Sequence, residues 1–100
     1  MAGRKYALDA MVDTDNPVPV RKALRGILGS DAVEPGEKPG EFHVRLEMAG
    51  ESAKDLNRDL LSALRRVEKK TRLRAEWTAM DGTVYRFFDY VLKKRLGPQS

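Results

Sequence analysis

Two separate segments of this chain alternate apolar and polar residues with a period of two, and this alternation constrains the fold more than any other feature. Every second residue is apolar from Lys5 to Val12, and the pattern returns from Phe42 to Met48. Such segments form strands with one buried face, because successive side chains point to opposite sides of a sheet. The apolar sets are Tyr6, Leu8, Ala10 and Val12 in the first segment and Phe42, Val44, Leu46 and Met48 in the second. We therefore expect a sheet with one covered face and one open face.

Two amphipathic helices are predicted, one after each of these strands. Asn16 and Pro17 are typical of a helix start and Gly29 of a helix end, which predicts a helix over residues 17–28. A second, longer helix begins after Ser52, a favoured N-cap residue, and ends in a basic turn that suits the negative end of the helix dipole. Its apolar stripe consists of Leu56, Leu60, Leu61, Ala63, Leu64 and Val67.

Residues 72–97 have two interpretations. One is a strand followed by a helix from about Val84 to Leu96, since the apolar residues there have helical spacing. The other is a β-hairpin that turns at Asp81-Gly82, a favoured pair for a two-residue turn. The run Val-Tyr-Arg-Phe-Phe favours the hairpin, because β-branched and aromatic residues form strands more readily than helices.

The two-residue turn predicts the register of this hairpin. It places Ala79 opposite Val84 and Trp77 opposite Arg86. Tyr85 and Phe87 then lie on the open face with Arg72 and Arg74. A small-ligand pocket near Trp77 is neither supported nor excluded by the sequence.

The predicted fold class is α/β, more closely an α+β two-layer sandwich. The elements follow the order β-α-β-α-β-β, and a mixed four-stranded sheet carries both helices on one face because crossovers are right-handed. We expect a single domain over residues 1–100, with a flexible loop at 30–41 and a disordered tail at 97–100. The order of elements resembles that of the C-terminal domain of the third bacterial translation initiation factor and that of the archaeal chromatin protein Alba. The resemblance lies in element order alone, so no residue roles follow from it.

Positive charge is concentrated in the second half of the chain. Residues 1–50 hold seven Lys or Arg against eight Asp or Glu, whereas residues 51–100 hold twelve against seven. Parallel strands would gather most of these cations at one end of the molecule with Arg4, Lys5 and Arg25, and acidic residues at the other. The acidic residues expected there are Asp13, Asp15, Glu51, Asp55 and Asp81.

A basic pole beside exposed aromatic residues predicts binding of nucleic acid, with RNA as the expected partner. The residues assigned to this site are Arg65, Arg66, Lys69, Lys70, Arg72, Arg74, Tyr85, Phe87, Lys93, Lys94 and Arg95. The alternative hypothesis is a protein-interaction module, or a homodimer formed through the open face, that buries Met11, Phe87 and Val91.

Several classes of function are disfavoured by the composition. The chain has no Cys, which removes disulfides and thiolate metal sites, and it has no apolar run long enough to span a membrane. The segment that begins it lacks the apolar stretch of a signal peptide, so we expect a cytoplasmic protein. His43 is the one histidine, and no phosphate-binding glycine loop or nucleophile motif is present. We expect a non-enzymatic protein without a cofactor or bound metal.

Overall fold

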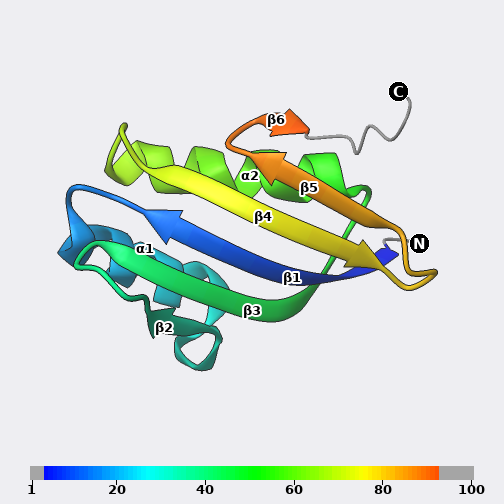
Figure 1. Cartoon of the computed structure of the whole chain (residues 1–100), viewed down its shortest axis with the longest axis horizontal. Helices are drawn as coiled ribbons and strands as arrows, with labels where there is room; N and C mark the ends of the chain where they lie inside the picture. Colours follow the sequence, from blue (N-terminus) through cyan, green and yellow to red (C-terminus); the bar gives the residue numbers. More distant parts are fainter. Residues whose placement is uncertain (1–3, 93–100) are drawn as a thin grey trace.

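The structure is a computed structural model that describes residues 4–92, and it has two layers, a six-stranded sheet and a pair of helices. Both helices lie on the same side of the sheet, as the sequence predicted (Figure 1). In chain order the elements are β1 (Arg4–Asp13), α1 (Pro17–Leu28), the 3₁₀ helix η1 (Ser30–Ala32), β2 (Val33–Pro35), β3 (Glu41–Gly50), α2 (Ala53–Val67), β4 (Arg72–Ala79), β5 (Val84–Phe88) and β6 (Val91–Leu92).

The sheet has the order β2-β3-β1-β4-β5-β6, and every neighbouring pair is antiparallel. The expected mixed four-stranded sheet is therefore wrong. β3 and β4 do run in the same direction, joined by α2, but β1 lies between them and pairs with both. The α+β class and the two-layer arrangement are confirmed.

Residues 29–40 explain why β1 and β3 are antiparallel neighbours. A 12-residue helix such as α1 is about 18 Å long, and twelve further residues can extend well beyond that length. The chain therefore travels back along α1 and returns before β3 begins, where Thr14 N donates to Gly40 O at 2.9 Å. This segment, expected as a loop, contains η1 and β2, which pairs with the edge of β3. Its mobility stays a prediction, and the tail at 97–100 lies outside the described residues.

The core fills the space between the two layers. The apolar sets predicted for the first two strands point toward the helices, and α2 contributes the largest share of leucines. The buried residues are Tyr6, Leu8, Ala10, Val12, Val20, Leu24, Phe42, Val44, Ala53, Leu56, Leu60, Leu61, Leu64, Leu73, Ala75, Trp77 and Phe87. Ser52 caps α2 as predicted, since its Oγ accepts from Asp55 N at 3.1 Å. The Asn16 side chain makes no capping hydrogen bond to α1.

Residues 72–92 fold back as a hairpin, so the helical interpretation is wrong within the described part of this region. The register differs by one residue from the prediction: Trp77 lies opposite Tyr85, and Glu76 lies opposite Arg86. The turn has three residues instead of two, because Ala79 N donates to Thr83 O at 2.8 Å. Gly82 has a φ of +91°, the left-handed conformation found in such turns.

The shifted register reverses which residues of β5 face the helices, because side chains alternate along a strand. The predicted register would have turned Arg86 into the core beside Trp77, where no partner for its charge was available. The observed register sends Arg86 outward, where its Nε donates to Glu76 Oε2 at 2.9 Å. Phe87 takes the inward position.

Candidate functional site

The open face is the side of the sheet that neither helix covers (Figure 1). It carries alternate residues of the four longest strands. These are Glu41, His43, Arg45, Glu47 and Ala49 from β3; Lys5, Ala7, Asp9, Met11 and Asp13 from β1; Arg72, Arg74, Glu76 and Thr78 from β4; and Val84, Arg86 and Phe88 from β5. Five of these side chains are Lys or Arg and five are Asp or Glu, and Glu34 of the short edge strand β2 lies on the same side beside His43, so the open face is close to balanced in charge.

Cross-strand pairs cross the middle of the open face. Asp9 approaches two side chains of β3: its Oδ1 lies 2.7 Å from His43 Nε2, and its Oδ2 lies 3.8 Å from Arg45 Nε. Arg86 and Glu76 form the corresponding pair between β5 and β4. The register brings these partners together, because Asp9 lies directly opposite Arg45 and diagonal to His43, and Glu76 lies directly opposite Arg86.

A shallow pocket of about 550 Å³ lies among these pairs. Met11, Arg74 and Phe88 contribute to its lining. The guanidinium carbon of Arg74 lies 5.7 Å from the centroid of the Phe88 ring, so the cation stacks on the aromatic face. The Phe88 residue is 38% exposed to solvent. The centre of the open face therefore offers apolar contact area within a ring of charged groups.

The two aromatic residues predicted for this surface lie on the other side of the sheet. Phe87 is 5% exposed and belongs to the core. Tyr85 packs against the core, and its ring meets that of Tyr6 edge-on at 6.4 Å between centroids. The expected platform of Tyr85 and Phe87 is therefore absent, and Phe88 supplies an aromatic ring instead. The charge of Arg86 was the signal that sequence reasoning missed. A charged side chain has to face solvent, and Phe88 lies on the same face of β5 as Arg86, so Phe88 faces solvent too.

The predicted cations that the structure describes lie in two places, the open face and the C-terminal end of α2. Arg72 and Arg74 lie on the open face, as expected. Arg66, Lys69 and Lys70 are exposed around the C-terminal end of α2. Lys93, Lys94 and Arg95 lie outside the described residues.

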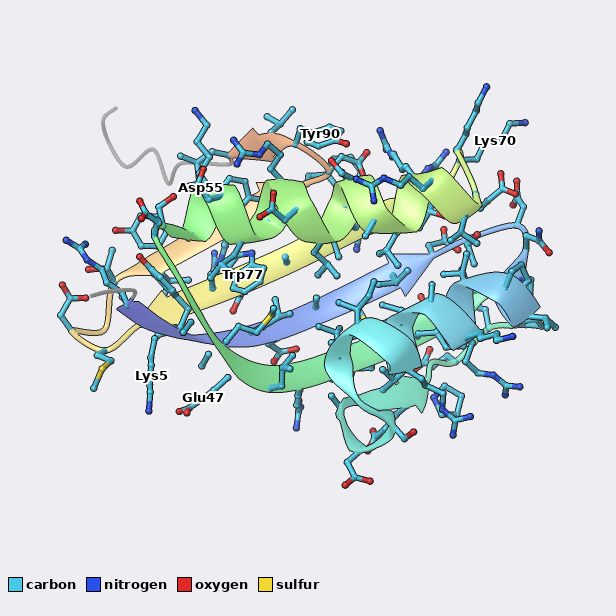
Figure 2. All side chains as sticks on the ribbon, turned by 180° about the vertical axis from the view of Figure 1, so that it is seen from behind. Lys5, Glu47, Asp55, Lys70, Trp77 and Tyr90 are labelled. Carbon is cyan, nitrogen blue, oxygen red and sulfur yellow. The ribbon has the colours of Figure 1, made fainter. Side chains whose placement is uncertain are left out.

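Arg65 has structural partners. Its Nη2 lies 3.3 Å from Asp89 Oδ2, and its Nε donates to Thr71 O at 3.0 Å. Its guanidinium also lies over the ring of Tyr90, 5.3 Å from the centroid. Tyr90 packs along α2 in Figure 2, where its hydroxyl lies 3.3 Å from Ser62 Oγ. These contacts hold the turn between β5 and β6 against α2.

The predicted basic and acidic poles are not formed. Since β1 and β4 are antiparallel, Asp13 pairs with Arg72, and the basic start of β1 lies at the far end of the sheet. Figure 2 shows Lys5 and Lys70 at opposite ends of the molecule. A polar cleft of about 280 Å³ near Lys70 mixes both signs of charge; its lining is Asp13, Thr14, Asp15, Arg65, Lys70, Arg72 and Asp89.

Asp81 is also at the end opposite to the one expected, because it lines a pocket with Arg4 and Lys5. The pKa of the Asp81 carboxyl lies below its ordinary value, chiefly because the backbone N–H of Thr83 donates a hydrogen bond to it and secondly because the Thr83 side chain does so. Acidic and basic residues are thus interspersed at both ends of the sheet.

Trp77 has a structural role. Its side chain is fully buried between the sheet and α2 (Figure 2), and its Nε1 donates to Asn57 Oδ1 at 3.2 Å. The same Asn57 side chain donates to Asp89 O at 2.8 Å. The indole is enclosed by the core, which leaves it no surface for a ligand.

Within residues 4–92, no cluster of three His, Asp or Glu side chains suits a metal ion, and no helix is long and apolar enough to cross a membrane. The features that stand out are the charge-balanced open face and its central pocket. Comparisons with family models, curated proteins and solved structures find no match to this chain.

Proposed function

We propose that this chain is a protein-interaction domain that binds a partner protein through its open face. The observation that carries the proposal is an apolar centre on a charge-balanced surface. Met11 and Phe88 line the central pocket, and the paired carboxylates of Asp9 and Glu76 lie at its margin. Protein interfaces share this anatomy, with aromatic and apolar groups at the centre and polar groups at the rim.

Nucleic-acid binding, the function expected from the sequence, has less support from the geometry. Phosphate binding depends on an excess of cations, whereas the open face has no such excess. Arg86 also has a carboxylate partner. Arg72 and Arg74 remain beside Phe88, and these three residues would form a small site for a single strand. RNA binding is therefore an alternative outcome of the experiment below.

A photo-crosslinking amino acid placed on either side of the molecule tests the proposal. Thr78 on the open face and Ala63 on α2 are both partly exposed, which makes them matched positions. In cells that produce the tagged protein, the probe at Thr78 is expected to crosslink to one defined protein, and the probe at Ala63 is not. Excess wild-type protein should compete with this crosslink, and excess Phe88→Glu protein should not.

Two outcomes contradict the proposal. One is a crosslinking pattern that is the same from Thr78 and Ala63, or absent from both. The other is binding of short single-stranded RNA that disappears when Arg72 and Arg74 are replaced by Ala. In that case the affinity should fall with salt at a logarithmic slope of about −0.7 per phosphate contact.

A further inference from the structure

We propose that the partner is a second copy of this chain, packed open face to open face across a twofold axis that runs along the strands between β1 and β4. This inference rests on the proposed function, because it names the partner of the same surface. Each open face would be covered by the other, and the helices of both copies would lie on the outside.

The charges of the open face divide at the boundary between β1 and β4. The half formed by β2, β3 and β1 carries five carboxylates against two Lys or Arg, whereas the β4–β5 half carries three Arg against one Glu. The first set is Lys5, Asp9, Asp13, Glu34, Glu41, Arg45 and Glu47, and the second is Arg72, Arg74, Glu76 and Arg86. The halves therefore have formal charges of −3 and +2, although the whole face carries a formal charge of only −1.

The charges that lack an ion-pair partner show the same division. Within residues 4–92, Arg72 and Arg74 of the basic half have no carboxylate within ion-pair distance. In that same part of the chain, four carboxylates of the acidic half have no cation within that distance, namely Asp13, Glu34, Glu41 and Glu47, and Lys5 is the one cation of that half without an ion-pair partner. Each half thus retains the charges that the other could satisfy in a second molecule.

Symmetry converts this division into a preferred orientation. A twofold axis parallel to the strands exchanges the two halves, so the basic half of each copy faces the acidic half of the other. An axis in the plane of the interface but perpendicular to the strands would place each half opposite the same half of the second copy, so that like charges would face each other. Twofold dimers are the commonest oligomers, and antiparallel sheets pack face to face at roughly 30° with a separation of about 10 Å.

The open face is large enough for a stable dimer, and its centre has apolar groups to bury. The molecule measures 39 × 34 Å in its two longer directions, and Figure 1 shows the sheet spread in that plane. A standard interface covers roughly 800 Å² on each partner. Val84 and Val91 are exposed on this face with Phe88, since Val91 pairs with Phe88 across the β5–β6 turn.

Sedimentation over a wide range of protein concentration tests the inference. Wild type is expected to dimerise, and Phe88→Glu should weaken dimerisation by at least about tenfold because it buries a charge at the centre. Ile27→Glu is the matched control, since Ile27 is an exposed apolar residue on α1. It should dimerise like wild type. Circular dichroism establishes that each variant is folded.

A charge exchange tests the orientation with variants that keep Phe88. Arg72→Glu with Arg74→Glu makes both halves acidic, and Asp13→Lys with Glu47→Lys makes the acidic half basic. Each double variant alone should be monomeric, and an equimolar mixture should form a heterodimer. A mixture that stays monomeric while wild type dimerises overturns the proposed orientation.

The remaining outcomes separate this inference from the proposed function. A dimer that Phe88→Glu leaves unchanged forms through another surface, and it overturns the second copy as the partner of the open face. A monomeric wild type that still gives Thr78-specific crosslinks to a different protein overturns the second copy alone. A monomeric wild type without such crosslinks overturns both proposals.

Discussion

Polar groups on the two sides of the sheet are held in different ways. On the covered side, Asn57 is buried and bonds both Trp77 and Asp89. On the open face, Arg86 and Glu76 form a pair whose side chains remain 56% and 47% exposed. A buried polar group that loses its partner cannot form a hydrogen bond to water instead, whereas the groups of an exposed pair can. The covered side therefore specifies the fold, and the open face is able to exchange its partners for those of another molecule.

The largest effect is expected at Asn57. Replacing Asn57 by Ala removes the partner of two groups, the buried Trp77 Nε1–H and the partly buried Asp89 C=O. We expect the free energy of unfolding to fall by about 2–4 kcal/mol in urea titrations. Asn16→Ala is the control, because the Asn16 side chain does not cap α1. Equal losses for the two variants would contradict the structural role of Asn57.

The second-largest loss of stability is expected at Asp89, because this residue combines an unusual backbone conformation with several hydrogen bonds. Its φ is +60°, Leu73 N donates to its Oδ1 at 2.9 Å, and Arg65 lies at its Oδ2. Asp89→Ala should lower the unfolding free energy by about 1–3 kcal/mol. Asp89→Asn should lower it less, since Asn tolerates this conformation and can still accept from Leu73. A larger loss for Asn than for Ala would refute this account.

A pair of glycine substitutions tests the turn that sets the hairpin register. Gly82→Ala should destabilise the protein by about 1 kcal/mol, because a φ of +91° is unfavourable for Ala. Gly26→Ala should instead stabilise it by about 0.5–1 kcal/mol, since Gly26 lies in α1 with open space around it. Thermal unfolding measures both changes. The same sign for both substitutions would mean that the turn is wrongly described.

The smallest effect is expected for the exposed pair on the open face. Arg86→Ala should change the unfolding free energy by no more than about 1 kcal/mol, and added salt should reduce the change. Glu76→Ala and the double variant complete a cycle that isolates the pair. A coupling energy as large as the loss at Asn57 would erase the distinction between the two sides of the sheet.

The elements that sequence analysis predicted well are those decided by local patterns. Period-two alternation located β1 and β3, and Ser52 located the start of α2. The pairing of strands was harder to predict, because it depended on residues 29–40. That segment has no periodicity, yet it carries the chain back to the end of β1 and makes β3 an antiparallel neighbour.

The prediction of the candidate site depended on the register of the β4–β5 hairpin, which differed by one residue from the observed register. Asp81-Gly82 fits a two-residue turn and also the observed three-residue turn, so the turn sequence alone did not decide between them. The shorter turn predicted Phe87 on the open face, whereas the observed register places Phe88 there. The charge of Arg86 was the information that could have decided it, because only the observed register keeps this side chain in solvent.

The central claim is that Phe88 and the open face form an interface between two copies, and isotope-filtered NOE spectroscopy tests it most directly. A mixture of ¹³C-labelled and unlabelled protein reports contacts between copies alone. The account predicts intermolecular NOEs from Phe88 of one copy to open-face residues on β1 and β3 of the other, and none from Phe87. Intermolecular NOEs confined to α1 and α2, or none at concentrations where sedimentation detects a dimer, would contradict it.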